Sequence, residues 1–231
     1  MKQLWEKVNE CVNKSLEKIP VNLISERIEA ITDIENPMRT EGSINIILIG
    51  DSGVGKTNVF SRYFQNKFEQ NFISTIGMDR QTKYIKYKHK IYKVNISDTA
   101  GQERFRSLPI KYYQNADGAL LLYDIAFRES FDNINVWMND LKKNTRNTTK
   151  QTIYLVGNKI DLPNRQVSQE EGKDLAEKYG LQYYEMSCKI NINIYEIISR
   201  LIIDCFNNLT EGEENTFKLK NKEKNRKKGC C

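Results

Sequence analysis

Short apolar runs alternate with stretches of helical periodicity between residues 44 and 210. Six runs have the length and composition of strands: residues 44–49, 79–86, 91–97, 119–123, 152–156 and 182–185. Four stretches favour helices: residues 56–65, 128–145, 168–179 and 192–207. This alternation predicts an α/β fold with a doubly wound, mainly parallel six-stranded sheet that binds ligands at the carboxyl ends of its strands. Because only a short turn separates residues 86 and 91, we expect one antiparallel edge strand.

Residues 1–43 precede this alternation and carry two apolar series at helical spacing. The first is Trp5, Val8, Val12, Leu16 and Ile19, and the second is Ile24, Ile28, Ile31 and Ile34. Both predict short amphipathic helices. Three interpretations stay open for this extension: helices packed on the domain's own surface, an arm that binds a partner, and disorder.

The net charge of +6 is concentrated in residues 217–231, the last part of the tail 211–231. Residues 217–231 contain seven Lys/Arg and one Glu; subtracting them from the totals of 36 and 30 leaves 29 of each, so the remainder is neutral. Basicity confined to a tail favours a membrane surface as partner and argues against nucleic acid. The longest apolar run, residues 119–123, is too short to span a bilayer, and the polar first ten residues do not resemble a signal peptide.

Cysteine and histidine usage narrows the chemistry further. The five cysteines show no zinc-site spacing, and adjacent Cys230 and Cys231 would make a poor structural disulfide, so we expect a reducing, cytosolic setting. His89 is the only histidine and falls in an expected hairpin turn. Catalysis by histidine and metal clusters of several histidines are therefore excluded.

A phosphate-binding loop follows the first predicted strand. Residues 50–57 match G-x-x-x-x-G-K-[ST], and the residues expected to touch nucleotide here are Gly50, Asp51, Ser52, Gly53, Val54, Gly55, Lys56, Thr57 and Asn58. The glycines let backbone N–H groups face a phosphate, Lys56 adds positive charge for the β- and γ-phosphates, and the Thr57 hydroxyl can ligate Mg²⁺. Alone, this loop also fits an ATPase or a nucleotide kinase.

Two further motifs follow predicted strands. Residues 158–161 read Asn-Lys-Ile-Asp, in which Asp161 can accept both N1–H and N2–H₂ of guanine and Lys159 can lie along the base plane. Residues 98–102 read Asp-Thr-Ala-Gly-Gln, in which Asp98 can reach Mg²⁺ through water. The N–H of Gly101 can contact the γ-phosphate, and Gln102 can orient the attacking water. Together the three motifs predict a guanine-nucleotide site.

These motifs, with Glu-Met-Ser-Cys-Lys at residues 185–189, have the order and spacing found in Ras-like small GTPases. Several other stretches resemble the Rab branch of that family: residues 74–79, 104–107, 112–113, 122–125 and the terminal Cys-Cys. The resemblance covers residues 44–210 and the last two residues, and the N-terminal extension lies outside it. It implies three segments: the extension 1–43, a GTPase domain 44–210, and a basic hypervariable tail 211–231.

The resemblance also implies roles for individual residues. It makes Thr75 a switch threonine that ligates Mg²⁺ only beside a γ-phosphate, so the implied metal ligands are Thr57, Thr75 and Asp98. Phe68 would pack on the guanine, and Asn158, Ser187, the N–H of Cys188 and Lys189 would complete the base pocket; the family usually has alanine at the cysteine position. The implied catalytic residues are Gln102, Lys56 and Thr75.

A Rab-like protein is expected to hydrolyse GTP to GDP slowly, because no arginine is placed to act in cis, and to switch vesicle traffic on and off. The implied partners are a guanine nucleotide exchange factor, a GTPase-activating protein, a GDP dissociation inhibitor and a prenylation escort. Lipids on Cys230 and Cys231 would hold it on the cytoplasmic face of an intracellular membrane, with a cytosolic pool. The alternative is a nucleotide-bound scaffold with negligible turnover.

Two positions depart from the Rab pattern. Arg80 stands where the family usually has phenylalanine, and Ser97 stands where it usually has tryptophan. In the family these two and an aromatic matching Tyr112 form an exposed apolar surface that effectors contact. We expect Arg80 and Ser97 on adjacent antiparallel strands, sharing an exposed face. The change indicates either compensated drift or an altered choice of partner.

Overall fold

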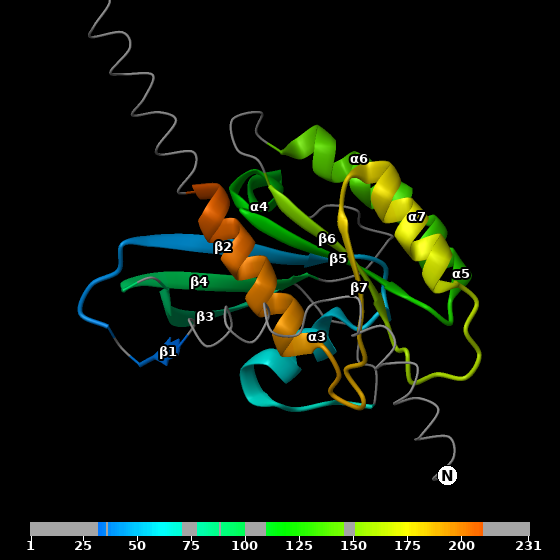
Figure 1. The fold of residues 1–231 in the computed structure, drawn as a ribbon, viewed down its shortest axis with the longest axis horizontal. Coiled ribbons are helices and arrows are strands. Elements are labelled where there is room, and N and C mark those ends of the chain that lie inside the picture. The colour runs from blue at the N-terminus through cyan, green and yellow to red at the C-terminus, as the bar shows by residue number, and fades with distance from the viewer. Residues whose placement is uncertain are drawn as a thin grey trace, which may run out of the picture.

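The computed structural model describes residues 32–35, 37–70, 78–87, 89–99, 110–145 and 151–209. At its centre lies a seven-stranded sheet in the order β1-β3-β4-β2-β5-β6-β7 (Figure 1). The strands are β1 (Thr32–Ile34), β2 (Gly42–Ile49), β3 (Met78–Tyr87), β4 (Lys90–Thr99), β5 (Gly118–Asp124), β6 (Thr152–Asn158) and β7 (Gln182–Glu185). All six strands predicted from the sequence are confirmed.

The middle of the sheet is parallel and the β1–β3–β4 side is antiparallel. Strand β2 pairs in parallel with β4 and β5, and the parallel order continues through β6 to β7. Every residue of β5 is buried, which is the signature of a parallel strand covered on both faces. On β2, Ile46 and Leu48 enter one core while Ile47 and Ile49 enter the other.

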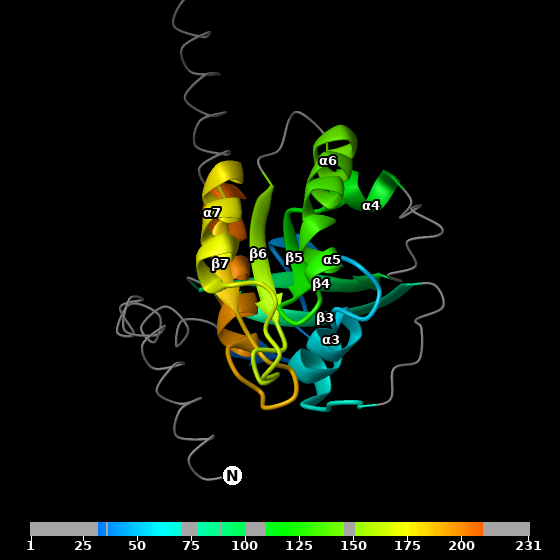
Figure 2. The same cartoon turned by 90° about the vertical axis from the view of Figure 1, so that its right-hand side faces the viewer.

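Helices cover both faces of the sheet. They are α3 (Lys56–Gln65), α4 (Ile110–Asn115), α5 (Arg128–Asp132), α6 (Ile134–Asn144), α7 (Gln169–Tyr179) and a C-terminal helix over residues 194–209. The core on one face includes α3 and the C-terminal helix, and the core on the other includes α4, α6 and α7. Figure 2 shows α4 and α6 across the sheet from the C-terminal helix, drawn in orange. The doubly wound arrangement is therefore confirmed.

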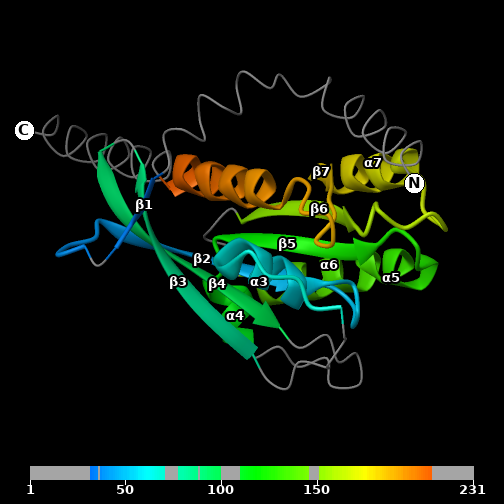
Figure 3. The same cartoon turned by 90° about the horizontal axis from the view of Figure 1, so that it is seen from below.

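The N-terminal side of the chain differs from the prediction. Ile34 lies in β1 and pairs with Tyr84 of β3, so it does not belong to a second amphipathic helix. A 2.8 Å ion pair between Lys83 and Asp33 links the same two strands. Strand β1 thus occupies the outer edge of the sheet beside β3 (Figure 3) and satisfies backbone groups that an edge leaves unpaired. The remaining predicted helical positions, up to Ile31, lie outside the described residues.

Two smaller differences concern helices. The predicted helix over residues 128–145 is present but interrupted at Asn133, whose side chain bonds to Asp51 of the phosphate loop. Helix α4 was not predicted, because six residues are too few to show a helical period. His89 lies in the turn between β3 and β4 with φ of +67° and is exposed, as expected. Within the ranges given above, no helix has the length and apolar character needed to cross a membrane.

Candidate nucleotide-binding site

The phosphate loop joins the end of β2 to the start of α3, and its glycines have positive φ. The values are 137° at Gly50, 76° at Gly53 and 104° at Gly55. A Cβ added at Gly50 would lie 2.2 Å from the carbonyl oxygen of Leu122, and one added at Gly55 would lie 2.4 Å from Nδ2 of Asn158. At these two positions both the backbone angle and the space require glycine.

The first turn of α3 is prepared for an anion. Lys56 is only 4% exposed, and its ammonium donates 2.7 Å hydrogen bonds to the carbonyl oxygens of Gly50 and Asp51, which bends it back over the loop. The helix has no acidic residue in its first turn and no side-chain cap at Gly55. The backbone N–H groups of the first turn and the positive end of the helix dipole therefore lie beside the loop, where they favour phosphate.

Asp98 has the environment of a metal ligand. It lies near the end of β4, is 1% exposed, and its Oδ1 has no hydrogen-bond partner in the described part of the chain. Burial raises the pKa of Asp98, while a hydrogen bond with Thr57 and the charge of Lys56 act in the opposite direction. A buried carboxylate oxygen beside a hydroxyl is the donor set that Mg²⁺ accepts, so these residues fit the ion. Thr75, the third implied ligand, lies outside the described residues.

The predicted base residues meet at the carboxyl ends of β6 and β7. Asn158 ends β6, and its Nδ2 donates a 2.8 Å hydrogen bond to the carbonyl oxygen of Val54 in the phosphate loop. The Ser187 hydroxyl donates to Oδ1 of Asp161 at 2.5 Å, and the Lys189 ammonium lies 4.0 Å from Oδ2 of the same carboxylate. The phosphate loop and the base loops are thus directly bonded to each other.

Phe68 approaches the same region from the segment after α3. The guanidinium carbon of Arg62 lies 5.7 Å from the centroid of the Phe68 ring. Asn58 fixes this segment, because its side chain accepts from the Glu69 N–H at 2.9 Å and donates to the Glu69 carbonyl at 3.1 Å.

The structure therefore brings together most of the predicted site: residues 50–58, Phe68, Asp98, residues 158–161 and residues 187–189. Their roles toward nucleotide stay predictions. Five predicted positions lie outside the described residues: Thr75, Gly101, Gln102, Cys230 and Cys231.

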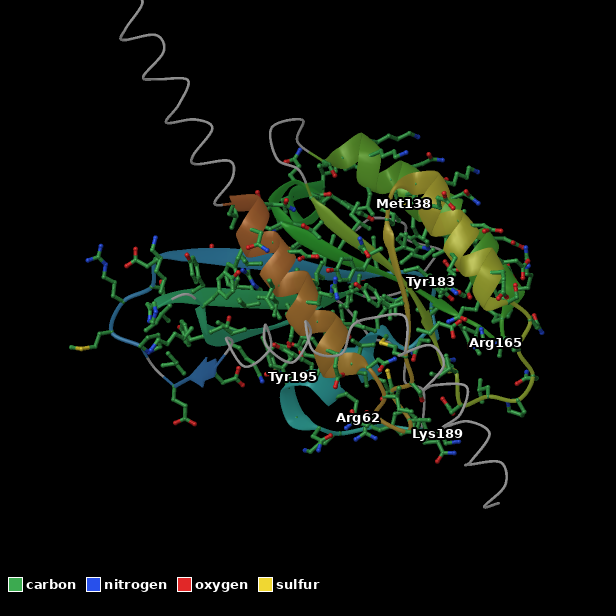
Figure 4. The ribbon with its side chains drawn as sticks, in the orientation of Figure 1. Arg62, Met138, Arg165, Tyr183, Lys189 and Tyr195 are labelled. Atoms are coloured by element: carbon green, nitrogen blue, oxygen red, sulfur yellow. The ribbon has the colours of Figure 1, made fainter. Side chains whose placement is uncertain are left out.

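Sequence reasoning missed the contacts of Arg62. From α3, its Nε donates to the carbonyl oxygen of Cys188 at 2.7 Å and its Nη2 donates to that of Lys189 at 3.2 Å. Figure 4 shows Arg62 and Lys189 close together at this end of the molecule. Arg62 thus ties the helix that follows the phosphate loop to a base loop 126 residues away, a contact that no local pattern could reveal.

Asp124 and the side chain of Asp51 also have roles that the motifs did not show. The Asp124 carboxylate forms an ion pair with the Lys159 ammonium, with 2.7 Å between Oδ2 and Nζ, and this contact holds the lysine of the base motif. Asp51 is 4% exposed and accepts from Nδ2 of Asn133 at 2.7 Å and from Nε1 of Trp137 at 2.6 Å. The Asp51 carboxylate therefore anchors the phosphate loop to α6, which leaves its backbone to face a nucleotide.

The cysteine in the base loop is buried and unreactive in character. Burial raises the pKa of the Cys188 thiol to about 12, and its Sγ lies 3.6 Å from Oδ1 of Asn158. The thiol is thus neutral at physiological pH and fills space beside the asparagine, so the replacement of alanine by cysteine leaves the backbone N–H unchanged.

Comparison with known proteins agrees with this geometry. The sequence profile of the Ras family matches residues 45–207. Ras-related protein RABA5e of Arabidopsis thaliana is 43% identical over 179 residues, which cover 77% of this chain and 81% of that relative. Ras-related protein Rab-11B of Dictyostelium discoideum is 40% identical over 181 residues, or 78% and 81%. GTP-binding protein ypt2 of Schizosaccharomyces pombe is 42% identical over 156 residues, or 66% and 76%.

The profile match spans well over half of the chain. The sequence identity to these three relatives is 40% or more over most of their length. On this evidence the chain belongs to the Ras family and, within it, to the Rab-related small GTPases.

Proposed function

We propose that this protein binds GTP, hydrolyses it to GDP and phosphate, and acts as a lipid-anchored switch in vesicle trafficking. The observation that carries the proposal is the direct bond from Asn158 to Val54, which joins a phosphate loop to a loop holding a guanine-type acceptor. The GTPase domain would comprise residues 44–210, with the extension 1–43 and the tail 211–231 outside it.

Selection of guanine would depend on Asp161. Its Oδ1 is held by the Ser187 hydroxyl, so the carboxylate is oriented before a base arrives. Ionised carboxylate oxygens accept hydrogen bonds and do not donate, which suits guanine N1–H and N2–H₂ and offers adenine no matching pair. The ion pair between Lys159 and Asp124 would fix the lysine along the base plane.

Hydrolysis would proceed by positioning and charge stabilisation. Lys56 and the N–H groups at the start of α3 would hold the β- and γ-phosphates, and Gln102 would orient the attacking water. Thr57, Thr75 and Asp98 would hold Mg²⁺, which would neutralise charge on the phosphates. With no arginine of this chain assigned to the developing charge, an activating protein would supply one, an effect of about 10³–10⁵ in rate.

The signal would end when phosphate leaves and the contacts of Thr75 and Gly101 with it are lost. Two geranylgeranyl chains on Cys230 and Cys231 would anchor the protein, with the basic tail adding attraction to an anionic leaflet. Exchange factor, activating protein, GDP dissociation inhibitor and prenylation escort would be its partners. It would then divide between a cytosolic pool and the cytoplasmic face of an intracellular membrane.

Single-turnover release of phosphate tests this proposal. The protein loaded with GTP and Mg²⁺ should release phosphate slowly. An activating protein for Rab-related GTPases should increase the rate of this release. Gln102→Leu should keep nucleotide affinity and lose the acceleration, because only the orientation of water is removed. Equal stimulated rates for both proteins would contradict the role of Gln102, and no phosphate release from either would favour the scaffold without turnover.

A further inference from the structure

A polar cavity of about 510 Å³ lies between the β2–β4–β3 part of the sheet and α4. Its principal lining residues are Asn45, Arg80, Ser97, Lys111, Tyr112 and Asp117, and we call it the β3–α4 pocket. In sequence, β3 begins directly after residues 71–77, which contain Thr75, and α4 begins directly after residues 100–109, which contain Gln102. Two of the elements that line the pocket, β3 and α4, therefore follow directly in sequence after the two segments expected to respond to the γ-phosphate.

Two of the lining residues, Arg80 and Asn45, belong to a chain of hydrogen bonds across three strands. Arg80 donates from Nη2 to Oδ1 of Asn45 at 2.9 Å, and Nδ2 of Asn95 donates to the same oxygen at 3.1 Å. Thr82 donates its hydroxyl to Oδ1 of Asn95 at 2.8 Å. Arg80 and Ser97 lie on adjacent antiparallel strands, as predicted, and are directly paired, but Ser97 is only 5% exposed and lines the pocket, so the expected exposed position of Ser97 is wrong. The small serine side chain leaves the cavity open, and the network orients the guanidinium.

The charges in the pocket are unbalanced toward the positive. Arg80 is exposed, and neither it nor Lys111 forms an ion pair with a carboxylate of the described residues. The Lys111 ammonium instead lies 5.1 Å from the centroid of the Tyr112 ring. Asp117, the one acid among the described lining residues, accepts from the backbone N–H of Asn45 at 2.8 Å and from its side chain at 3.4 Å, and burial raises the pKa of Asp117.

We propose that the β3–α4 pocket binds the carboxylate of an Asp or Glu side chain on a partner protein, with Arg80 as its principal ligand. A guanidinium has five N–H donors in a planar fork, and among the residues that the structure describes the Arg80 side chain forms one hydrogen bond, to Asn45. The remaining donors suit a two-oxygen acceptor. An anionic membrane is the weaker match, because lipid surfaces are recognised by clusters of about four to eight basic residues and the described lining of this pocket has two, Arg80 and Lys111.

This inference rests on the proposed function, because a partner that binds only the GTP-bound state requires a protein that switches between two states. It predicts a docking site different in chemistry from the apolar surface of typical Rab proteins. The partner would place an acidic side chain where an aromatic contact is usual.

The test uses a displayed library of helical peptides as the probe. The target is the full chain loaded with a non-hydrolysable GTP analogue and Mg²⁺. Peptides that also bind a Ser97→Trp variant are discarded, because the tryptophan is expected to fill the pocket. The retained peptides should share an acidic residue whose change to alanine weakens binding at least about tenfold, which corresponds to about 1.4 kcal/mol. Arg80→Glu should weaken binding equally or more, and reversing the peptide's acid to arginine should restore it.

Lys86→Glu is the matched control. Lys86 is exposed on the same strand and the same face, six residues from Arg80 and therefore about 20 Å away, so its reversal should leave binding unchanged. Both substitutions lie on the surface, so failure to fold should not obscure the result.

Three outcomes would overturn the proposal: retained peptides without a required acid, equal loss from Lys86→Glu, or no peptide that distinguishes the filled pocket. Preferential loss of binding to phosphatidylserine vesicles with Arg80→Glu would assign the pocket to lipid instead. GTP turnover is measured on the same preparations. A protein without turnover would defeat the proposed function, whereas binding that needs no acid would defeat only the assignment of the pocket.

Discussion

Trp137→Phe should loosen the phosphate loop through a residue that does not belong to it. Trp137 donates its indole N–H to the buried carboxylate of Asp51 at 2.6 Å, and Asn133 donates to the other carboxylate oxygen. Phenylalanine keeps an aromatic ring against the core but removes the N–H donor, together with the smaller ring of the indole. The change therefore tests whether the anchor on α6 supports nucleotide binding.

The expected loss follows from the charge and burial of the acceptor. A hydrogen bond to a charged group contributes about 1.5–3 kcal/mol net. Because Asn133 remains as a donor to the 4% exposed Asp51, we expect the lower part of that range, about 1.5–2 kcal/mol in the free energy of unfolding. If the loop must be ordered to hold nucleotide, the same loss appears as GDP dissociation about tenfold faster, since tenfold corresponds to about 1.4 kcal/mol.

The assay pairs urea denaturation at fixed GDP and Mg²⁺ with release of a fluorescent GDP analogue. Tyr179→Phe is the control, because it removes a neutral 2.7 Å hydrogen bond from Tyr179 of α7 to Asn135 of α6, the helix that carries Trp137, and this bond does not involve the phosphate loop. The control should lose about 1 kcal/mol of stability and keep the wild-type rate of GDP release. Identical release rates for the two variants would refute the claim that the anchor on α6 supports the nucleotide site.

Three further expectations concern other parts of the chain. Removing Cys230 and Cys231 should move the protein from membranes to the cytosol, because the tail's charges are screened beyond about 10 Å in salt; fractionation of cells would show membrane retention if the extension were the anchor. Burial raises the pKa of Cys188 and Cys205 to about 12 from about 9, so their stabilising effect is complete below pH 9 and is lost as pH rises toward 12. Denaturation between pH 9 and pH 12 would contradict this if the free energy of unfolding stayed constant. Labelling of the folded protein at pH 8 would contradict it if the thiols of Cys188 and Cys205 reacted. Gly55→Ala should weaken GDP binding at least tenfold, because the residue has φ of 104° and the new Cβ would lie 2.4 Å from a base-loop nitrogen; unchanged affinity would show that the loop can adjust.

The sequence predicted what is local and contiguous. The phosphate loop and the base motif are runs of adjacent residues, and each follows a strand whose apolar character reflects burial on both faces. Arg80 and Ser97 could be placed on adjacent antiparallel strands because only a short turn separates the two strands in sequence.

The sequence could not reveal the contacts that join these parts. Arg62 reaches Cys188 across 126 residues, and Trp137 reaches Asp51 across 86, so neither contact has a linear signature. Ile34 continues a helical spacing in the sequence, yet pairing with β3 places it in a strand. Ser97 was expected on an exposed face, and its burial depends on how the neighbouring strands and α4 enclose it.

Equilibrium competition by unlabelled nucleotides against a labelled GDP analogue tests the central claim most directly. The unmodified protein with Mg²⁺ should prefer GDP and GTP to ATP by several orders of magnitude, because the Asp161 carboxylate, held by Ser187, pairs with guanine alone. Asp161→Asn should lose that preference and shift toward xanthine nucleotides, while phosphate contacts stay intact. If ATP competed as well as GTP, or if Asp161→Asn left guanine selection unchanged, the assignment of this chain as a guanine-nucleotide switch would be wrong.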